Sequence, residues 1–229
     1  MLILALETST ELGSCALWRD GAITERRCPE KRPHSETLLP LVRDLLAESG
    51  VRIGDLNAIA FGVGPGAFTG LRVACGAAQG LAVVAGLSLI PVTSLETLAA
   101  SAGADRVLAL LDARMGEVYS ACYEREEAGH ALRGEIRVSA PADIVLPADS
   151  GWLACGNGLM AYPELLDRVR KAGLAIEPGS LPTAATVAAI AAGKAARGEG
   201  IDAAEAAPLY VRDKVAKTVA ERMREGGKA

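Results

Sequence analysis

Two carboxylates that end apolar runs are the first candidates for chemistry in this sequence. Glu7, followed by Thr8 and Ser9, ends the run 2–6, and Asp112 ends a similar run. The hydroxyl and main-chain N–H groups around Glu7 could hold a nucleotide phosphate. Asp112 could bind the water shell of a magnesium ion. A polar turn that caps a strand explains the same residues without a ligand, so both interpretations stay open.

A glycine-rich string, Gly62-Val-Gly-Pro-Gly-Ala-Phe-Thr-Gly70, precedes an apolar segment of helical length. A helix N-terminus after such a string can bind phosphate. The string lacks the Gly-Lys-Ser/Thr ending of a P-loop and does not match a G-x-G-x-x-G dinucleotide motif. We therefore interpret it first as a strand-to-helix turn, in which glycine permits positive φ and close backbone packing.

The histidines and cysteines form no motif for metal binding or nucleophilic catalysis. His34 and His130 are far apart, and neither has a partner at metal-ligand spacing. The five cysteines are odd in number, scattered and without a C-x-x-C, which argues against a disulfide framework and a zinc knuckle. We place His34 at the start of a helix and His130 in a solvated loop. We expect no metal, no catalytic residue, and no cofactor beyond weakly bound ATP or ADP.

The elements that position these residues follow a repeated order. Residues 1–100 predict the order β-β-β-α-β-α-β-α. The order then starts again, because Val107–Tyr123 can be laid over Ile3–Trp18 as a strand ending in a carboxylate, a turn and a second strand. A strand near Trp152–Cys155 and a helix near Thr183–Arg197 fit the later part of this second copy. A repeat of about a hundred residues predicts an α/β protein with two β-β-β-α-β-α lobes, the actin-like/sugar-kinase (ASKHA) fold.

This repeat divides the chain into an N-terminal lobe, residues 1–102, and a C-terminal lobe with the C-terminal tail, residues 103–229. In such a fold the carboxylates of Glu7 and Asp112 would point into the cleft between the lobes. Working phosphotransferases of this architecture usually have Asp followed by Gly and Thr at the first position. Here the Asp is a Glu and the Gly is missing. We therefore expect a weak nucleotide site at best.

Two predicted helices have more apolar surface than one sheet face can cover. In the helix expected over Ser35–Ser49, with Ser35 as its N-cap, the apolar arc spans about 160°, against about 100° for an ordinary one-sided helix. The helix expected over Thr69–Ala85 is almost uniformly apolar. Such a surplus favours a protein–protein interface, although a core covered by both lobes would need the same residues. The candidate interface residues are Leu38, Leu39, Val42, Leu45, Leu46, Phe68, Leu71, Arg72 and Cys75.

Charge and hydropathy limit the surroundings in which the chain can act. It has 24 Lys and Arg against 28 Asp and Glu, a formal net charge of −4. A duplex-binding protein normally shows a basic patch, so we expect any nucleic acid to be met through a partner. The uncharged run 73–95 is long enough to cross a membrane, but its glycines and Pro91 favour a buried helix and a strand. No signal-peptide pattern is present, and we expect a cytoplasmic protein without membrane contact.

Several of these segments closely resemble the TsaB (YeaZ) family. The segments are Leu2–Ser9, His34–Pro40, Gly64–Arg72, Leu111–Arg114 with Glu117–Tyr119, and Pro208–Arg212. They span nearly the whole chain, and the strings Gly64–Arg72 and His34–Pro40 are the most specific. The resemblance implies the actin-like two-lobed fold. It also implies a role in forming the threonylcarbamoyl group on the tRNA adenosine beside the anticodon.

The resemblance further implies that this chain is a non-catalytic subunit. The family is similar to its paralogue TsaD, which transfers the threonylcarbamoyl group from its adenylate to tRNA and has a paired-histidine metal site. Ser94 and Leu98 stand at the corresponding positions here, and they cannot replace two imidazoles on a metal. The implied function is a scaffold or activator that binds a TsaD-like protein, with a TsaE-like ATPase as third member. It would reach tRNA only through the complex and form a homodimer when alone.

Two other functions compete with this interpretation. A small-molecule kinase or nucleotide-binding protein of the same fold is disfavoured by the unusual Glu7 turn, and phosphate transfer to a sugar or acid would support it. A metallopeptidase is disfavoured because the sequence has no H-x-x-x-H, and metal analysis would decide the matter.

Overall fold

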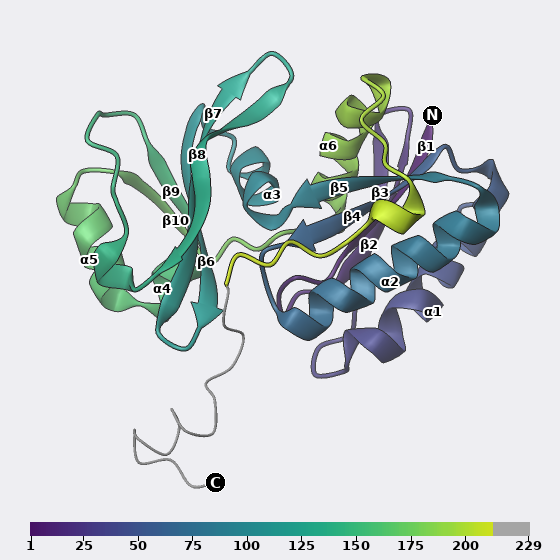
Figure 1. Cartoon of the computed structure of the whole chain (residues 1–229), viewed down its shortest axis with the longest axis horizontal. Coiled ribbons are helices and arrows are strands. Elements are labelled where there is room, and N and C mark those ends of the chain that lie inside the picture. The colour runs from purple at the N-terminus through teal and green to yellow at the C-terminus, as the bar shows by residue number, and fades with distance from the viewer. Residues whose placement is uncertain (213–229) are drawn as a thin grey trace, which may run out of the picture.

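The computed structural model describes residues 1–212, which form two lobes, each built on a five-stranded sheet (Figure 1). The first sheet has the order β3-β2-β1-β4-β5, and the second has the matching order β8-β7-β6-β9-β10. The predicted internal repeat and the two-lobed α/β fold are therefore confirmed. The tail from residue 213, which the sequence assigns to the second lobe, lies outside the described residues. The strands are β1 (Leu2–Glu7), β2 (Ser14–Arg19), β3 (Ala22–Arg27), β4 (Ala58–Gly64), β5 (Ser88–Thr93), β6 (Arg106–Arg114), β7 (Glu117–Glu126), β8 (Gly129–Ser139), β9 (Leu153–Gly156) and β10 (Ala175–Pro178).

The central strands are apolar because both of their faces are covered. In β1, Leu4 and Leu6 point into one hydrophobic cluster, and Ile3 and Ala5 point into another. This follows from the alternation of side chains along a strand. β1 pairs antiparallel with β2 and parallel with β4, and β6 pairs in the same way with β7 and β9.

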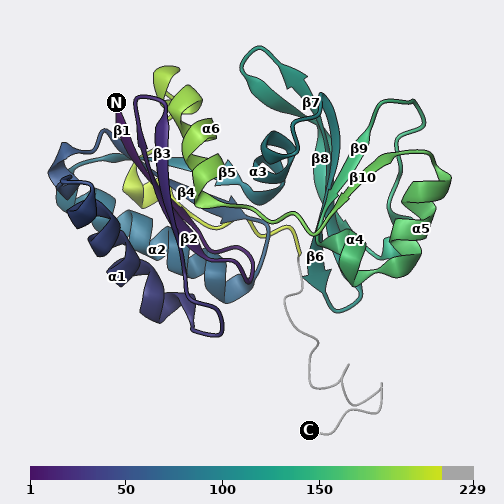
Figure 2. The same ribbon diagram turned by 180° about the vertical axis from the view of Figure 1, so that it is seen from behind.

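Helices cover the sheets and fill the space between them (Figures 1 and 2). On the first sheet, α1 and α2 lie on one face and α6 lies on the other, while α3 lies between the two sheets. The helices are α1 (His34–Glu48), α2 (Phe68–Ala85), α3 (Ser94–Ser101), α4 (Gly158–Ala161), α5 (Pro163–Lys171) and α6 (Ala184–Ala196), with 3-10 turns at Ile53–Asp55, Pro141–Asp143 and Ala203–Glu205.

The helix expected near Thr183–Arg197 is found as α6, but it packs on the first sheet rather than in the second lobe (Figure 2). Its buried face consists of small residues and Val187, which join the cluster of Ile3 and Ala5. The amide of Ala184 donates to Ser14 Oγ at 2.8 Å, which fixes the start of the helix. The chain thus returns to the first lobe after β10, while the division at residue 102 stays a prediction for the domain boundary.

Two local predictions were wrong. The first long helix begins at His34 after Pro33, so Ser35 is not its N-cap, and Thr37 Oγ1 instead donates to the carbonyl of Pro33 at 3.1 Å. His130 lies in β8 rather than in a solvated loop. The charges around it form cross-strand pairs between β7 and β8, such as Arg133 with Glu124 at 2.8 Å. Pairs of opposite charge across two strands stabilise an exposed hairpin.

Within residues 1–212, α2 is long and apolar enough to cross a membrane by length and composition, with a mean hydropathy of 1.4. Its face of Leu71, Ala74, Ala78 and Ala82 is buried, and the helix packs against β4. Core helices pass the same test, and we interpret α2 as a core helix.

Candidate functional site

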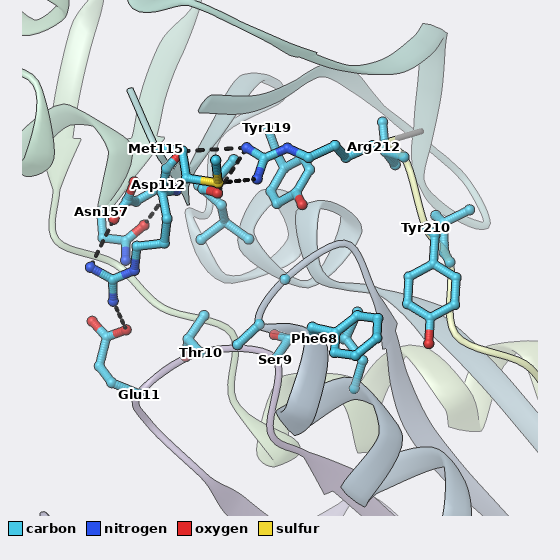
Figure 3. Close-up of a pocket in the computed structure, with 18 residues that line it drawn as sticks. Ser9, Thr10, Glu11, Phe68, Asp112, Met115, Tyr119, Asn157, Tyr210 and Arg212 are labelled. Atoms are coloured by element: carbon cyan, nitrogen blue, oxygen red, sulfur yellow. Dashed lines mark hydrogen bonds and ion pairs between the residues drawn. The ribbon is translucent and has the colours of Figure 1, made fainter. Parts of the chain in front are cut away.

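A cavity of about 260 Å³ lies between the two lobes. The first lobe contributes the turn after β1 and the start of α2. The second lobe contributes the β6–β7 turn and Asn157, and the segment Leu209–Arg212 closes one side. Figure 3 shows Ser9, Thr10 and Phe68 on one side of the cavity and Asp112 and Met115 on the other.

Glu7 does not line this cavity, so the prediction that its carboxylate points into the cleft was wrong. The side chain is fully buried over Gly62 of β4, where any β-carbon would clash with its carboxylate. Oε1 accepts a hydrogen bond from the amide of Ser9, while Oε2 is buried without a partner among the described residues. Desolvation raises the pKa of Glu7 and outweighs the hydrogen bonds from Ser9 and Thr8, which lower it.

Glu7→Gln should change how the free energy of unfolding depends on pH. The pKa of Glu7 is raised in the folded protein. Between the ordinary carboxyl pKa and this raised pKa, Glu7 therefore keeps its proton in the folded protein and loses it in the unfolded chain. The wild type should therefore lose stability relative to Glu7→Gln as pH rises from the ordinary carboxyl value to the raised value. The maximum slope is about 1.4 kcal/mol per pH unit. Urea unfolding at several pH values measures it, and the exposed Glu30→Gln is the control; parallel curves for Glu7→Gln and wild type would contradict the burial of an uncompensated carboxyl.

The glycine-rich string allows the turn after β1 to pack closely against the start of α2. A β-carbon at Gly66 would clash with Ser9, and one at Gly70 would clash with the carbonyl of Thr8. Thr8 Oγ1 is buried and donates to the carbonyl of Gly70 at 2.7 Å. Gly64 adopts a φ of 110°. The interpretation as a strand-to-helix turn is therefore confirmed, and Thr8 lies outside the cavity lining.

Of the four predicted nucleotide residues, the structure brings Ser9 and Asp112 to the cavity. Ser9 is buried, and its Oγ has no partner among the described residues. Asp112 is already paired: Oδ1 accepts from Tyr162 Oη at 3.0 Å and from the amide of Arg114 at 2.8 Å, and Oδ2 lies 3.1 Å from the Arg114 guanidinium. A carboxylate with these partners has little capacity left for a magnesium water shell.

The segment Pro208–Arg212 closes the cavity by contacting both lobes. The amide of Leu209 donates to the carbonyl of Val63 at 2.8 Å. Arg212 donates to the carbonyl of Ala113 at 3.0 Å and pairs with Glu117. The segment is therefore bonded to β4 of the first lobe and to the β6–β7 turn of the second lobe, and it connects the two lobes.

An exposed aromatic and cationic cluster lies where this segment meets α2. The Arg72 guanidinium carbon is 3.3 Å from the ring centre of Phe68 and 5.4 Å from that of Tyr210. The two rings are 5.7 Å apart. This arrangement is a cation–π contact, and it presents Phe68 and Arg72 at the start of α2.

Most of the predicted interface residues belong to the protein's own core. Leu39, Phe68 and Arg72 are exposed, whereas the other six are buried between the helices and the sheet. The wide apolar arc of α1 is needed because this helix contacts both α2 and the sheet. The buried six are Leu38, Val42, Leu45, Leu46, Leu71 and Cys75.

Phe68 and Arg72 belong to a longer exposed face of α2, whose other residues were not predicted from the sequence. We define the α2 face as the exposed residues Phe68, Arg72, Gly76, Gly80, Val83 and Val84. Gly76 and Gly80 have open space where a β-carbon would be. The pattern G-x-x-x-G, two glycines one turn apart inside a helix, was the available signal, because it permits close helix approach.

Comparisons with known proteins find one matching family model and several similar TsaB proteins. The model of the TsaD family, tRNA N6-adenosine threonylcarbamoyltransferase, matches residues 28–151. The tRNA threonylcarbamoyladenosine biosynthesis protein TsaB of Escherichia coli (strain K12) is 42% identical over 94% of this chain and 96% of its own length. The chain belongs to the TsaB family.

Other TsaB relatives and a solved structure extend the agreement. TsaB of Haemophilus influenzae is 34% identical over 94% of this chain and 95% of its own. The structure of YeaZ from Pseudomonas aeruginosa has a TM-score of 0.83 at 40% identity and covers 91% of this chain and 99% of that chain. The family and fold inferred by resemblance are confirmed, and TsaB membership assigns the chain to tRNA threonylcarbamoyladenosine biosynthesis.

The two positions that the resemblance matched to a TsaD metal site, Ser94 and Leu98, lie in the core of this chain. Ser94 begins α3, Leu98 follows one turn later, and both side chains are fully buried. Leu98 packs in the cluster of Leu95 and Leu111. No group of three or more His, Cys, Asp or Glu side chains that could hold a metal occurs in the described part of the chain. The metal-free state stays a prediction.

Proposed function

We propose that this TsaB protein is a non-catalytic scaffold or activator subunit in the threonylcarbamoyl modification of the tRNA adenosine next to the anticodon. It would act by binding a TsaD-like transferase through the α2 face and the exposed Leu39 of α1. Family membership supports the pathway, and the exposed glycines of α2 support the mode of action.

The α2 glycines carry this proposal because the isolated chain gains nothing from them. A glycine in a helix interior is roughly 1 kcal/mol less favourable than alanine. Apart from the neighbouring backbone of α2 itself, no atom of the described structure lies within 4 Å of a β-carbon built at Gly76 or Gly80. Flanking residues of this face include the exposed Phe68 and Val83. A partner helix could approach such a surface closely, with its backbone near the glycines and its side chains against the flanking residues.

The same face is the surface we propose for a homodimer when the TsaD-like partner is lacking. One surface that serves both partners would make homodimer and complex mutually exclusive. A TsaE-like ATPase would be the third member. With a net charge of −4, the chain would meet tRNA only through the complex. We also propose a cytoplasmic location, because the proposed complex acts on tRNA.

The cleft supports the proposal of a subunit without turnover of its own. Glu7 is buried away from the cavity, and Asp112 is engaged by Tyr162 and Arg114. We propose that the chain needs no cofactor and that ATP or ADP binds no tighter than about 0.1 mM, roughly −5.5 kcal/mol. Calorimetry with ATP and magnesium distinguishes this from a kinase of the same fold, for which micromolar binding abolished by Asp112→Ala is expected.

Reconstitution tests the proposed function directly. The chain, a TsaD-like protein and both together are supplied with tRNA and threonylcarbamoyl-adenylate, in parallel with sizing chromatography and elemental analysis. We expect co-elution of the two proteins, and no modified tRNA and no stoichiometric zinc or iron with the chain alone. The TsaD-like protein should gain turnover when the chain is added. Modified tRNA from the chain alone, or no effect and no co-elution, would contradict the proposal.

A further inference from the structure

The cavity between the lobes contains a buried hydroxyl group that the fold itself does not use. Tyr119 of β7 lines this cavity and is only 8% exposed. The hydroxyl of Tyr123, also on β7, is bonded to Thr93 Oγ1 at 3.2 Å. Tyr119 Oη has no hydrogen-bond partner within residues 1–212, and Figure 3 shows it pointing toward the side of the cavity on which Phe68 lies. Because a buried hydroxyl without a partner costs free energy, a ligand that bonds to it would be favoured.

The start of α2 supplies further unused donors on the side of the cavity that Tyr119 faces. Ala67 and Phe68 line the cavity there. Ala67 precedes the helix without a side-chain cap, and the first turn contains no acidic residue. The first hydrogen bond of the helix runs from the amide of Leu71 to the carbonyl of Ala67, at 2.9 Å. The amides of Phe68 and Thr69 therefore have no acceptor among the described residues, and free amides at a helix start favour a negatively charged group.

A third donor comes from the second lobe. Asn157 lines the cavity, and its Oδ1 accepts a hydrogen bond from the amide of Asp112 at 2.9 Å. This bond leaves Nδ2 as the donor end of the side chain, and Nδ2 has no acceptor in the described part of the chain. The unused groups of the cavity are therefore mainly donors, and they come from both lobes.

The charged groups around the cavity already neutralise one another. The guanidinium of Arg114 lies 3.1 Å from the carboxylate of Asp112 and 3.9 Å from that of Glu11. Arg212 pairs with Glu117. A ligand would therefore meet neutral donors and the partial positive charge of a helix end, which is about half an elementary charge. Such surroundings favour a group with one negative charge over a phosphate group with two.

The remaining lining is largely apolar. Leu71 of α2, Leu111 of β6 and Leu209 of the closing segment contribute aliphatic side chains to it. The half-exposed rings of Phe68 and Tyr210, with centres 5.7 Å apart, also belong to the lining. Pockets with apolar walls and a few convergent polar groups are typical of sites for small organic molecules. The walls thus fit a ligand with an apolar body beside its charged end.

We propose that the cavity between the lobes binds a small organic monocarboxylate. The carboxylate accepts hydrogen bonds from Tyr119 Oη, from Asn157 Nδ2 and from the first turn of α2, and the apolar body lies against the aliphatic lining. The site is distinct from the nucleotide site expected around Glu7 and Asp112, because neither of those carboxylates binds the ligand. This inference concerns the isolated chain and does not depend on the proposed partner.

Titration of the isotope-labelled chain with benzoate, followed by NMR, tests this site, because benzoate joins one carboxylate to an apolar ring. We expect saturable shifts in the millimolar range at the backbone amides of Phe68 and Thr69 and at the side-chain amide of Asn157. Tyr119→Phe removes only the hydroxyl and should weaken binding at least about tenfold, because a hydrogen bond to a charged group is lost. Without ligand, its melting temperature should equal or exceed that of the wild type, since the hydroxyl has no partner to lose.

Tyr123→Phe is the matched control, because it removes a hydroxyl that is bonded to Thr93 outside the cavity. It should lower the melting temperature and leave benzoate binding unchanged. Benzamide has the same ring without the charge, and inorganic phosphate has more charge without the apolar body. Both should bind at least about tenfold more weakly than benzoate.

Three results would overturn the proposal. The first is the lack of a saturable shift at these amides below about 50 mM benzoate, which corresponds to roughly −1.8 kcal/mol. The second is equal benzoate affinity of the wild type and Tyr119→Phe. The third is binding of phosphate or benzamide at least as tight as that of benzoate, because the site would then not select a monocarboxylate.

Discussion

Leu45→Glu is expected to unfold the first lobe, whereas Leu39→Glu is expected to leave the chain folded and to weaken its association with a partner. Leu45 is 0% exposed between α1 and the sheet, and Leu39 is 49% exposed. Losing a buried leucine costs about 2–5 kcal/mol, and the buried carboxylate adds a desolvation penalty. The total is comparable with the whole stability of a domain, about 5–15 kcal/mol.

At Leu39 the same change should alter the free energy of unfolding by only about 0.5 kcal/mol. In a partner interface it should weaken association by about 2 kcal/mol or more, roughly 30-fold. Thermal unfolding and sizing chromatography, alone and with a TsaD-like protein, measure both quantities. Arg43→Glu, at an exposed position of α1, is the control and should affect neither. If Leu39→Glu still associates normally, the interface does not include this end of α1.

Gly80→Leu should abolish pairing through α2 without harming the isolated chain. A side chain at Gly80 enters open space in the described structure, and leucine favours the helix more than glycine does by nearly 1 kcal/mol. In the proposed interface the same side chain would hold the partner helix away, because side-chain contacts there depend on close backbone approach. We expect association to weaken at least about 100-fold, the effect of losing about 2.7 kcal/mol, while the melting temperature stays equal or rises.

Gly80→Ala provides a graded test of the same surface. Alanine should raise the stability of the isolated chain by roughly 0.8–1 kcal/mol and weaken association less than leucine does. Gly193→Ala in α6 is the matched control: its β-carbon would meet only the tip of Arg197, at 3.4 Å, so it should stabilise without changing association. Normal association of Gly80→Leu with both itself and the TsaD-like protein would remove α2 from the proposed interface.

The sequence by itself determined the repeated strand order, the positions of the long helices and the family. Each rests on local information: apolar runs for β1 and β6, a continuous apolar segment for α2, and the specific string Gly64–Arg72. Even the packing interpretation of the glycine string came from local rules, because glycine at Gly64 is what a positive φ requires.

Only the tertiary structure decided where the side chains of those elements lie. Glu7 ends β1 and Asp112 lies two residues before the end of β6, so both carboxylates follow an apolar run. Glu7 is nevertheless buried away from the cavity, because Gly62, 55 residues later on β4, leaves room for its side chain. A helical wheel groups Leu39 with Leu46 at one edge of α1, but Leu46 is buried in the cluster that contains Val51 and Leu56, while Leu39 projects beyond it.

The placement of α6 has the same physical origin. Its sequence predicts a helix with a small-residue face, and such a face fits either sheet. Contacts with Ser14 and Glu96, far away in the chain, direct it to the first lobe. Periodicity reports which side chains share a face of one element. Which neighbour covers that face depends on contacts between residues distant in sequence, and these form only when the whole chain folds.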